Sequence, residues 1–226
     1  MTFDLSSAKW LNEPKRFELS ERSVGLTTEA KTDLWQRSYY GFRSDNAPAL
    51  LLESEANFSF TVRASFEYRF RFDQCGPIVY LDSENWFKAS VEHENARVSR
   101  LGSVVTNHGY SDWATTDIGA VTVMWYRLSR RGPDFLIESS ADGTEFGQMR
   151  IFHLHLLGET TTEMGRLTPP APAQRPVRFG VYACSPLDSS FDARFDSIRL
   201  ESCLWEAHDT GGAASGSGDS SSAPRG

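Results

Sequence analysis

Cysteine is scarce in this sequence of 226 residues. The chain carries only Cys75, Cys184 and Cys203, an odd number of thiols at wide spacing. Such a pattern matches neither a disulfide framework nor a CxxC metal-binding knuckle. We therefore expect free thiols, buried as small apolar side chains, in a protein of a reducing compartment.

Long apolar runs are missing as well. No stretch approaches the roughly 20 apolar residues that a membrane-spanning helix needs. Residues 1–10 also lack the basic segment and apolar run of a secretory signal. These absences predict a soluble, cytoplasmic protein without a membrane partner.

Positive charge is in deficit. Lys and Arg number 23 against 30 Asp and Glu, which gives a formal net charge of −7. Because nucleic-acid binding depends on clustered Lys and Arg, we expect no nucleic-acid partner. The phosphate-binding motifs GxxxxGK and strand-GxGxxG-helix do not occur, so we expect no cofactor.

Metal and nucleophile motifs are weak. His153 and His155 would share one strand face at a spacing that can chelate zinc, but no pattern supplies a third ligand. We therefore expect no metal. His108 has no Ser or Cys nucleophile near it in sequence, so a catalytic triad is not indicated.

Helical periodicity is absent, and alternation with a period of two takes its place from about residue 57 onward. Phe58, Phe60, Val62 and Ala64 alternate with polar residues. The same pattern continues through Phe66, Tyr68 and Phe70 and through these later segments: CGPIVYLD, NWFKASVEHE, RVSRLGSVVTNH, AVTVMWYRLSRRG, PDFLIESS, FGQMRIFHLHL, PVRFGVYACS and SFDARFDSIRLES. This pattern is typical of strands with one buried face.

Many strands with frequent turn signals favour an all-β, antiparallel, two-sheet jelly-roll sandwich. Asp142-Gly143 predicts a hairpin turn, because Gly accepts a positive φ at low cost. We expect residues 1–205 to form one domain, with the first 50 residues wrapped around the sandwich.

Two segments depart from the strand pattern. Residues 158–175 are polar, contain Pro169, Pro170 and Pro172, and are followed by Pro176, which predicts a long exposed loop. Whether this loop covers a binding site is open. Residues 206–226 form a tail rich in Gly and Ser that we expect to be disordered.

Aromatic and charged side chains are concentrated in residues 31–52. The block contains Trp35, Arg37, Tyr39, Tyr40, Phe42, Arg43, Asp45 and Asn46 within a dozen positions. Such a density of amphipathic side chains favours a ligand groove over a bare surface. We expect this block to form one wall of the groove.

Polar side chains share one face of the strand NWFKASVEHE. Alternation puts Phe87, Ala89 and Val91 on one face and Trp86, Lys88, Ser90 and Glu92 on the other. The polar face is either the floor of a concave binding sheet or an ordinary solvent-facing surface with an ion pair. Further along the chain, we expect Trp125 and Phe135 to lie in the core.

The segment SVVTNHGYSDWATT has the composition of a ligand-contacting loop. It contains Asn107, His108, Tyr110, Asp112 and Trp113 around Gly109. The same residues would also serve as an ordinary turn, since Asn, Gly, Ser and Asp are turn formers. Both interpretations stay open.

Glycoside hydrolysis needs two carboxylates at a defined separation. Glu92 and Glu138 are the candidate pair, because hydrophobic residues flank each of them on a strand. Either carboxylate could instead pair with Arg127 or Arg130.

Five segments together resemble a known family: TDLWQRSYYGFRSDNAP, DQCGPIVYLDSENWFKASVE, SVVTNHGYSDW, WYRLSRRGPDFLIESSADGTEF and VYACSPLDSSFDARFDSIRL. The sequence is similar to the domain family of unknown function that includes the fungal regulator of enolase. The resemblance implies a concanavalin A-like sandwich, found also beside glycosidases, with sugars bound on the concave sheet in lectin-like relatives. It implies no agreed catalytic residues, and fold analogy alone does not give a function.

The expected function is a lectin-like module that binds a carbohydrate or a polyol-like small molecule on the concave sheet face. The expected ligand-binding residues are Trp35, Arg37, Tyr39, Asp45, Gln74, Trp86, Lys88, Ser90, Glu92, Asn107 and Trp113. One alternative is a glycoside hydrolase or isomerase with Glu92 as acid or base and Lys88 or Arg37 as charge stabiliser. Another is a protein-interaction regulator of a metabolic enzyme.

Overall fold

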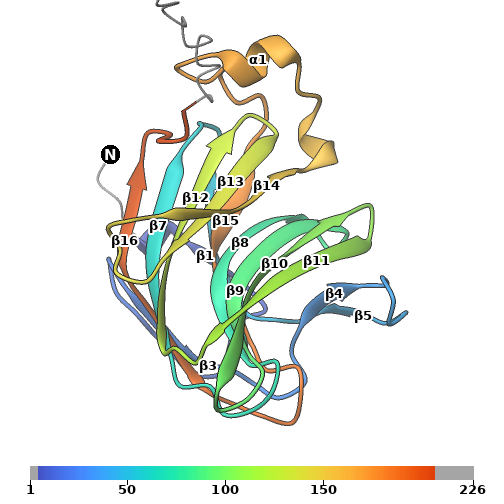
Figure 1. Ribbon diagram of the computed structural model, residues 1–226, viewed down its shortest axis with the longest axis vertical. Coiled ribbons are helices and arrows are strands. Elements are labelled where there is room, and N and C mark those ends of the chain that lie inside the picture. The colour runs from blue at the N-terminus through green and yellow to red at the C-terminus, as the bar shows by residue number, and fades with distance from the viewer. Residues whose placement is uncertain (1–4, 207–226) are drawn as a thin grey trace, which may run out of the picture.

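Two seven-stranded sheets face each other in the computed structural model, which describes residues 5–206, and a short hairpin lies beside them (Figure 1). Sheet A has the order β1-β6-β15-β8-β9-β10-β11. Sheet B has the order β14-β13-β12-β7-β16-β3-β2, and β4 and β5 form the separate hairpin. The predicted all-β, two-sheet jelly roll is therefore confirmed.

The strands of sheet A are β1 (Lys9–Leu11), β6 (Ala49–Ser54), β15 (Val177–Cys184), β8 (Gln74–Asp82), β9 (Asn85–His93), β10 (Val98–Asn107) and β11 (Tyr110–Gly119). Those of sheet B are β14 (Gly147–His153), β13 (Asp134–Ser140), β12 (Val123–Arg131), β7 (Ser59–Phe66), β16 (Asp192–Glu201), β3 (Val24–Thr27) and β2 (Phe17–Leu19). The hairpin comprises β4 (Leu34–Gln36) and β5 (Arg43–Asp45). Helical turns are short: Leu5–Ser7, His155–Leu157 and α1 (Thr162–Arg166).

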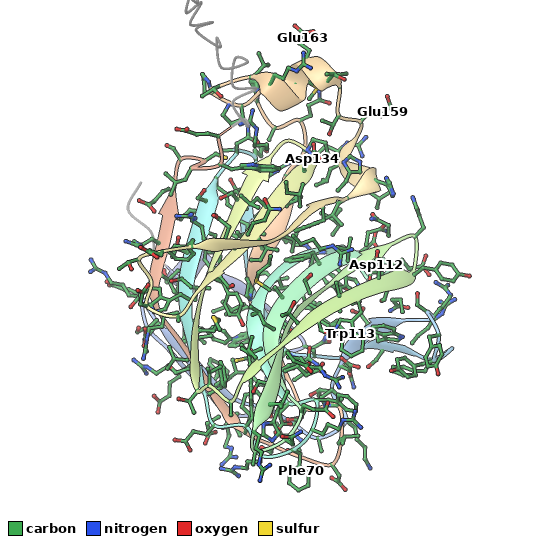
Figure 2. The ribbon with its side chains drawn as sticks, viewed as in Figure 1. Phe70, Asp112, Trp113, Asp134, Glu159 and Glu163 are labelled. Atoms are coloured by element: carbon green, nitrogen blue, oxygen red, sulfur yellow. The ribbon has the colours of Figure 1, made fainter. Side chains whose placement is uncertain are left out.

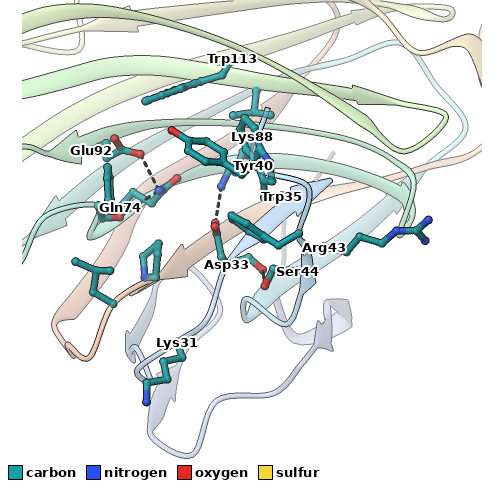
Figure 3. Close-up of a pocket in the computed structure, with 15 residues that line it drawn as sticks. Lys31, Asp33, Trp35, Tyr40, Arg43, Ser44, Gln74, Lys88, Glu92 and Trp113 are labelled. Carbon is teal, nitrogen blue, oxygen red and sulfur yellow. Dashed lines mark hydrogen bonds and ion pairs between the residues drawn. The ribbon is translucent and has the colours of Figure 1, made fainter. Parts of the chain in front are cut away.

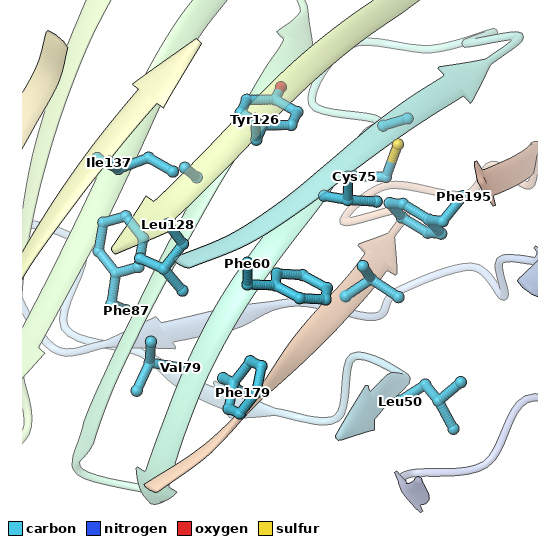
Figure 4. Close-up of a cluster of buried hydrophobic side chains, with 14 of the residues drawn as sticks. Leu50, Phe60, Cys75, Val79, Phe87, Tyr126, Leu128, Ile137, Phe179 and Phe195 are labelled. Atoms are coloured by element: carbon cyan, nitrogen blue, oxygen red, sulfur yellow. The ribbon is translucent and has the colours of Figure 1, made fainter. Parts of the chain in front are cut away.

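The main core lies between the two sheets, where alternate side chains of facing strands interdigitate (Figure 4). Phe87 of β9 stacks on Phe152 of β14 with ring centroids 3.8 Å apart. Phe60 of β7 meets Phe179 of β15 at 5.4 Å. Each fully buried ring contributes about 1.5 to 3 kcal/mol through the hydrophobic effect. The predicted inward face of Phe87, Ala89 and Val91 is confirmed.

A second apolar cluster covers the outer face of sheet A. Trp86, Ile78 and Tyr182 of the sheet pack there against Leu34 and other residues that lie across it. Sheet A is consequently buried on both faces near its middle. The polar face of β9 is therefore not an ordinary solvent-facing surface.

The first 50 residues do more than wrap around the sandwich. They contribute β1 to one edge of sheet A and the strands β2 and β3 to one edge of sheet B. Only the stretch after residue 30 crosses the outer face of sheet A as an added layer. A pocket forms between that layer and the sheet.

A tight turn joins β10 to β11. His108 and Gly109 both have positive φ angles, 50° and 73°, between the paired residues Asn107 and Tyr110. Two central residues with positive φ define a type I′ hairpin turn, whose twist matches the flanking strands. The segment therefore contains the predicted turn, and Trp113 belongs to the strand that follows it.

Two predicted strand patterns end early. β7 ends at Phe66, so Tyr68 and Phe70 belong to the following loop, where the Tyr68 hydroxyl donates to the Val91 carbonyl at 2.7 Å. β14 ends at His153, so His155 begins a 3₁₀ turn and does not share a strand face with His153. Alternation of apolar residues continues past a strand end where a loop also packs on the core.

The turn at Asp142-Gly143 joins β13 to β14 as predicted, with a φ of 80° at Gly143. The indole of Trp125 lies against this glycine, on the outer face of sheet B, and is only partly buried. The prediction that Trp125 lies in the core is therefore wrong. Phe135, fully buried, confirms the corresponding prediction.

Residues 158–175 form the predicted loop, with α1 within it. The buried guanidinium of Arg130 donates to the carbonyls of Ser54 and Arg175 and so ties the end of this loop to the sandwich. The predicted disordered tail after residue 206 lies outside the described residues. In the described range, no helix has the length and apolar character to cross a bilayer.

Candidate functional site

A pocket of about 410 Å³ lies between the outer face of sheet A and the residues that cross it (Figure 3). This volume is within the range of small-molecule sites. Side chains from β4, β5, β8, β9, β10 and β11 and from four loops contribute to it. The lining residues are Lys31, Asp33, Trp35, Tyr40, Phe42, Arg43, Ser44, Phe72, Gln74, Lys88, Glu92, Val104, Trp113, Pro186 and Leu187.

An ion pair joins the pocket floor to the crossing segment. The ammonium of Lys88 lies 3.0 Å from Oδ1 of Asp33, and the Lys88 side chain is only 4% exposed. Burial by itself lowers the pKa of Lys88, but the neighbouring acidic groups, Asp33 foremost, together outweigh burial and raise that pKa above its ordinary value. Lys88 therefore stays charged, and the ion pair fixes residue 33 over the sheet.

A second polar unit consists of Glu92, Gln74 and Tyr182. The Gln74 amide donates from Nε2 to Oε2 of Glu92 at 2.9 Å, while its Oε1 accepts from the Tyr182 hydroxyl at 2.9 Å. Because the Tyr182 hydroxyl fixes the orientation of the Gln74 amide, that amide in turn holds the Glu92 carboxyl in one position. Oε1 of Glu92 is buried and has no hydrogen-bond partner among the described residues.

The electrostatic environment favours the neutral form of Glu92. Burial raises its pKa from 4.5 to about 7, with Asp33 adding to the rise and Lys88 opposing it. At neutral pH, Glu92 is therefore a mixture of the neutral acid and the carboxylate. Since Oε2 accepts from Gln74, the proton of the neutral acid resides on Oε1. Such a group can donate to, or accept from, a polar ligand.

Aromatic rings form the walls. The rings of Trp35 on β4 and Trp113 on β11 meet edge to face, with centroids 6.4 Å apart. Tyr40 packs against Trp35 at 5.5 Å, and its hydroxyl points toward the pocket interior in Figure 3. Apolar walls around a few fixed polar groups are typical of sites that bind small organic molecules.

Two cations lie at the rim. The Lys31 ammonium makes no hydrogen bond or ion pair with another side chain between residues 5 and 206. The Arg43 guanidinium has only a 3.5 Å contact with Glu84, a carboxylate that Arg37 already binds at 2.9 Å. Of these two cations at the rim, only Lys31 is without a carboxylate partner among the described residues.

The structure brings together five of the residues that the sequence predicts for the site. Trp35, Gln74, Lys88, Glu92 and Trp113 all line the pocket. They come from β8, β9 and β11 of sheet A and from β4 of the separate hairpin. Figure 2 shows Trp113 on β11, with the neighbouring Asp112 on the same strand.

The other predicted residues do not line the pocket. Trp86 and Ser90 are buried in the layer beneath it, at 0% and 6% exposure. Asp45 accepts from the Tyr80 hydroxyl at 2.8 Å and serves the packing of β5. Arg37 and Tyr39 belong to the tip of the β4–β5 hairpin, outside the pocket.

Asn107 is also outside the pocket. Its amide donates from Nδ2 to the His153 carbonyl at 3.0 Å, and its Oδ1 accepts from the His155 backbone at 3.1 Å. Asn107 thus connects the β10–β11 turn to the end of β14. Its role in the fold is to hold these two segments together.

The candidate catalytic pair Glu92 and Glu138 is separated by the sandwich. Glu138 lies on sheet B, where Nε of Arg127 donates to its Oε2 at 2.6 Å. The alternative pairing of Glu138 with Arg127 is therefore confirmed, whereas Glu92 pairs with neither arginine. The second carboxylate of the pocket is Asp33.

The rings of His153 and His155 meet edge to face, with centroids 5.1 Å apart, but each also has a partner of its own. Nδ1 of His153 lies 2.7 Å from Oδ1 of Asp134, while the ring of His155 stacks on that of His108 with centroids 5.6 Å apart. Among residues 5–206, no group of three His, Cys, Asp or Glu side chains is arranged to hold a metal ion.

Asp33, Tyr40 and Phe42 lie in the block 31–52 that the sequence predicts as one wall of the groove, although none of them is among the predicted ligand-binding residues. Phe72 was missed altogether. The hairpin tip has positive φ angles that interrupt strand alternation, so Tyr40 and Phe42 face the pocket while Tyr39 does not. Asp33 had one indirect signal, because a lysine between apolar residues on a buried strand requires a carboxylate partner. No local pattern says which carboxylate that is.

The fold and the site define a concanavalin A-like jelly-roll sandwich with a polar and aromatic pocket on one outer face. Residues 10–203 match the family described as Protein of unknown function (DUF1349), and the chain belongs to this family. It is 31% identical over 208 residues to Regulation of enolase protein 1 of Saccharomyces cerevisiae, covering 91% of this chain and 96% of that one.

Solved structures agree with the fold. A functionally unknown protein from Saccharomyces cerevisiae superposes with a TM-score of 0.76 at 28% identity, over 89% of this chain and 100% of that chain. The GH43 protein BlXynB from Bacillus licheniformis gives 0.62 at 16% identity, over 87% of this chain and 37% of that chain. At that identity the second likeness shows the sandwich fold alone.

Proposed function

We propose that this protein is a lectin-like module of the cytoplasm that binds a carbohydrate or polyol-like small molecule in the pocket on sheet A. One observation carries the proposal. Fixed polar groups, namely the Glu92–Gln74 unit and the Lys88–Asp33 pair, form the floor below aromatic walls. Sugars present C–H faces that pack on rings and hydroxyls that both donate and accept hydrogen bonds, so this combination suits them.

The pairing of groups supports a neutral, hydroxyl-rich ligand more than an ion. Lys88 and Asp33 neutralise each other, and Glu92 has a pKa of about 7. The unpartnered Oε1 of Glu92 offers a ligand hydroxyl the hydrogen bond that the protein leaves unmade. Trp113 and Trp35 supply rings for the apolar face of the same ligand.

Titration calorimetry against monosaccharides, disaccharides, polyols, sugar acids and sugar phosphates tests the proposal. Binding of at least one compound is expected, with Trp35→Ala, Trp113→Ala and Glu92→Ala each weakening it about tenfold or more. Phe70→Ala removes an exposed ring that does not line the pocket and serves as the control. Silence across the whole panel overturns the proposal.

An enzyme is the second candidate, and a specific observation favours it. The pocket holds two carboxylates, Glu92 and Asp33, and the pKa of about 7 suits Glu92 to general acid or base catalysis. Lys88 would stabilise charge on Asp33 or on the substrate. Assay of aryl glycosides and of sugar isomerisation with wild type and Glu92→Gln tests this role. Turnover that is no higher than that of Glu92→Gln rules the enzyme out.

The yeast relative supports a third candidate, a protein-interaction role in regulating a metabolic enzyme. The support is the 31% identity to a protein named for regulation of enolase. Affinity capture with the full chain from a cytoplasmic extract tests this role. Capture without any stoichiometric partner would reject it.

A further inference from the structure

An unbroken series of aromatic rings leads from the pocket to the tip of the β4–β5 hairpin. Ring centroids are 6.4 Å apart for Trp113 and Trp35, 5.5 Å for Trp35 and Tyr40, and 4.9 Å for Tyr40 and Tyr39. From Trp35 outward, exposure rises from 9% to 54% at Tyr40 and 97% at Tyr39. The pocket therefore continues outward as a surface of rings.

The hairpin tip is held in a conformation that costs energy. Arg37 and Tyr39 are not glycines, yet they have φ angles of 55° and 60°. Such angles cost of order 1 kcal/mol each in a non-glycine residue and persist only where surrounding contacts impose them. Backbone strain of this kind is concentrated at functional sites, so it indicates a function for the exposed tip.

Contacts to the neighbouring β8–β9 and β10–β11 turns hold Arg37 in that conformation. The Arg37 guanidinium donates to the Gly109 carbonyl at 2.7 Å and to Glu84 at 2.9 Å. It also lies 5.4 Å from the centre of the Tyr110 ring. The indole of Trp35 donates to the Ser38 carbonyl at 3.1 Å. These contacts fix Arg37 and the Trp35 indole, on which Tyr40 packs, before any ligand arrives.

The exposed rings gather at this end of the molecule. Tyr39, Tyr40, Phe42 and Tyr110 are 97%, 54%, 48% and 63% exposed. In Figure 1 the hairpin projects from the body of the molecule beside β11. Contiguous exposed apolar surface marks a binding site more often than it marks plain surface.

We propose that the natural ligand is an oligosaccharide, with one sugar ring in the pocket and the next stacked on Tyr39 and Tyr40 at the hairpin tip. This inference rests on the proposed binding of carbohydrate in the pocket. Tyr39 and Tyr40 meet edge to face at 84°, so a broad face of the outer ring is free for a sugar. The series of rings begins at Trp113, inside the pocket, and so connects the two positions.

A narrow ligand fits this surface better than a folded protein does. A stable protein–protein interface buries roughly 1,200 to 2,000 Å² in total. The tip is a turn between two strands of three residues each, β4 and β5. A sugar chain needs only a line of rings, which is what the tip presents.

A length series of neutral oligosaccharides tests the inference. Xylo-, cello- and malto-oligosaccharides of about one to four units are titrated into the full chain by calorimetry. Affinity is expected to rise about threefold to tenfold from monomer to dimer or trimer, as one aromatic contact is added. Tyr39→Ala is expected to abolish that gain, so that the affinities for short and long sugars converge. Tyr39→Phe, which keeps the ring, is expected to retain the gain.

The outcomes separate this inference from the proposed function. Binding without a gain in affinity with length, or a gain that Tyr39→Ala leaves intact, overturns the oligosaccharide inference alone. Silence of every sugar with wild type overturns both. The control Phe70→Ala removes a ring of 54% exposure that is not part of the series and is expected to keep the length gain. If Tyr39→Ala instead releases a captured protein while the length gain stays, the tip is a protein-docking site and the inference fails.

Discussion

Glu92 is a buried carboxyl whose proton affinity is tied to the stability of the fold. Its pKa is 4.5 in an ordinary environment and about 7 in the folded chain, chiefly because of burial. Between those values the native state holds more protons than the unfolded state. For this group, stability is therefore greatest below about pH 4.5 and falls as pH rises to about 7.

Replacing Glu92 by Gln removes this titration. In the wild type, titration of Glu92 is expected to lower the free energy of unfolding by about 2 to 3 kcal/mol between about pH 5 and pH 8. In Glu92→Gln, this contribution to the pH dependence of stability should be absent. Urea unfolding of both proteins across this range measures the difference. Identical slopes for the two proteins would show that Glu92 does not carry the effect.

The Lys88–Asp33 pair is buried, and its two charges depend on each other. Asp33→Asn leaves the Lys88 ammonium uncompensated at 4% exposure and is expected to destabilise the chain by about 3 kcal/mol or more. Adding Lys88→Met removes that charge and should recover a large part of the loss. Chemical unfolding of the single and double variants measures the coupling.

The matched control is a pair on the surface. Lys15 and Glu29 are 3.3 Å apart, with side chains that are 85% and 38% exposed. Because solvent screens such a pair, Glu29→Gln is expected to change stability by less than about 1 kcal/mol. Equal losses for Asp33→Asn and Glu29→Gln would contradict the buried-pair account.

At the scale of elements, the close approach of β8 and β9 positions the pocket floor. Gly76 lies between Gln74 and Ile78 on the outer face of sheet A, and a Cβ there would sit 2.0 Å from the Ala89 carbonyl oxygen. No side chain can occupy that space without moving one of the two strands. The glycine therefore allows Gln74 and Glu92 to lie side by side on neighbouring strands.

Gly76→Ala is expected to destabilise the protein by about 3 kcal/mol and to weaken ligand binding, because β8 must shift away from β9. Gly147→Ala is the matched control, since a Cβ at Gly147 meets no atom within 4 Å. That variant should leave stability within about 1 kcal/mol of wild type. Thermal unfolding of the two variants distinguishes them, and a neutral Gly76→Ala would refute the close-approach argument.

Element prediction from sequence succeeded where one face alone was buried. β7 and β12 show the expected alternation, and their inward residues are in the core. It failed for β11, whose residues are mostly exposed and carry no apolar alternation. β11 is instead specified by the type I′ turn at His108 and Gly109 and by its hydrogen bonds to β10.

At the scale of the whole molecule, the three thiols report on the integrity of the sandwich. Cys75 and Cys184 are fully buried, one in each apolar cluster, whereas Cys203 is only partly buried. Burial raises the pKa of the Cys75 thiol to about 12 and raises that of Cys184 as well. A thiol in its protonated, inaccessible form does not react.

We therefore expect a thiol reagent to label Cys203 first in the native protein, and Cys75 and Cys184 only as fast as the sandwich opens. Mass spectrometry of peptides after timed labelling measures the three rates separately. Cys203→Ser should remove the fast phase and leave the slow one. Rapid labelling of Cys184 in the native state would show that the layer over sheet A opens independently of the sandwich.

The sequence by itself determined the fold class and part of the site. Period-two alternation reflects the geometry of a single strand, so it predicts two antiparallel sheets and the shared face of Lys88 and Glu92 without knowledge of distant residues. The resemblance in five segments likewise indicated the family before any comparison of structures.

Only the tertiary structure decided what lies over that face. The crossing of residues 31–48 depends on the packing of Leu34 and Ala47 against Trp86 and Tyr182, residues far apart in sequence. This packing makes Asp33 the partner of Lys88 and puts Tyr40 in the pocket. The strand order likewise places Glu138, on β13, in the other sheet. Local sterics set the period of a strand, but which side chains meet across layers depends on how the whole chain buries its apolar surface.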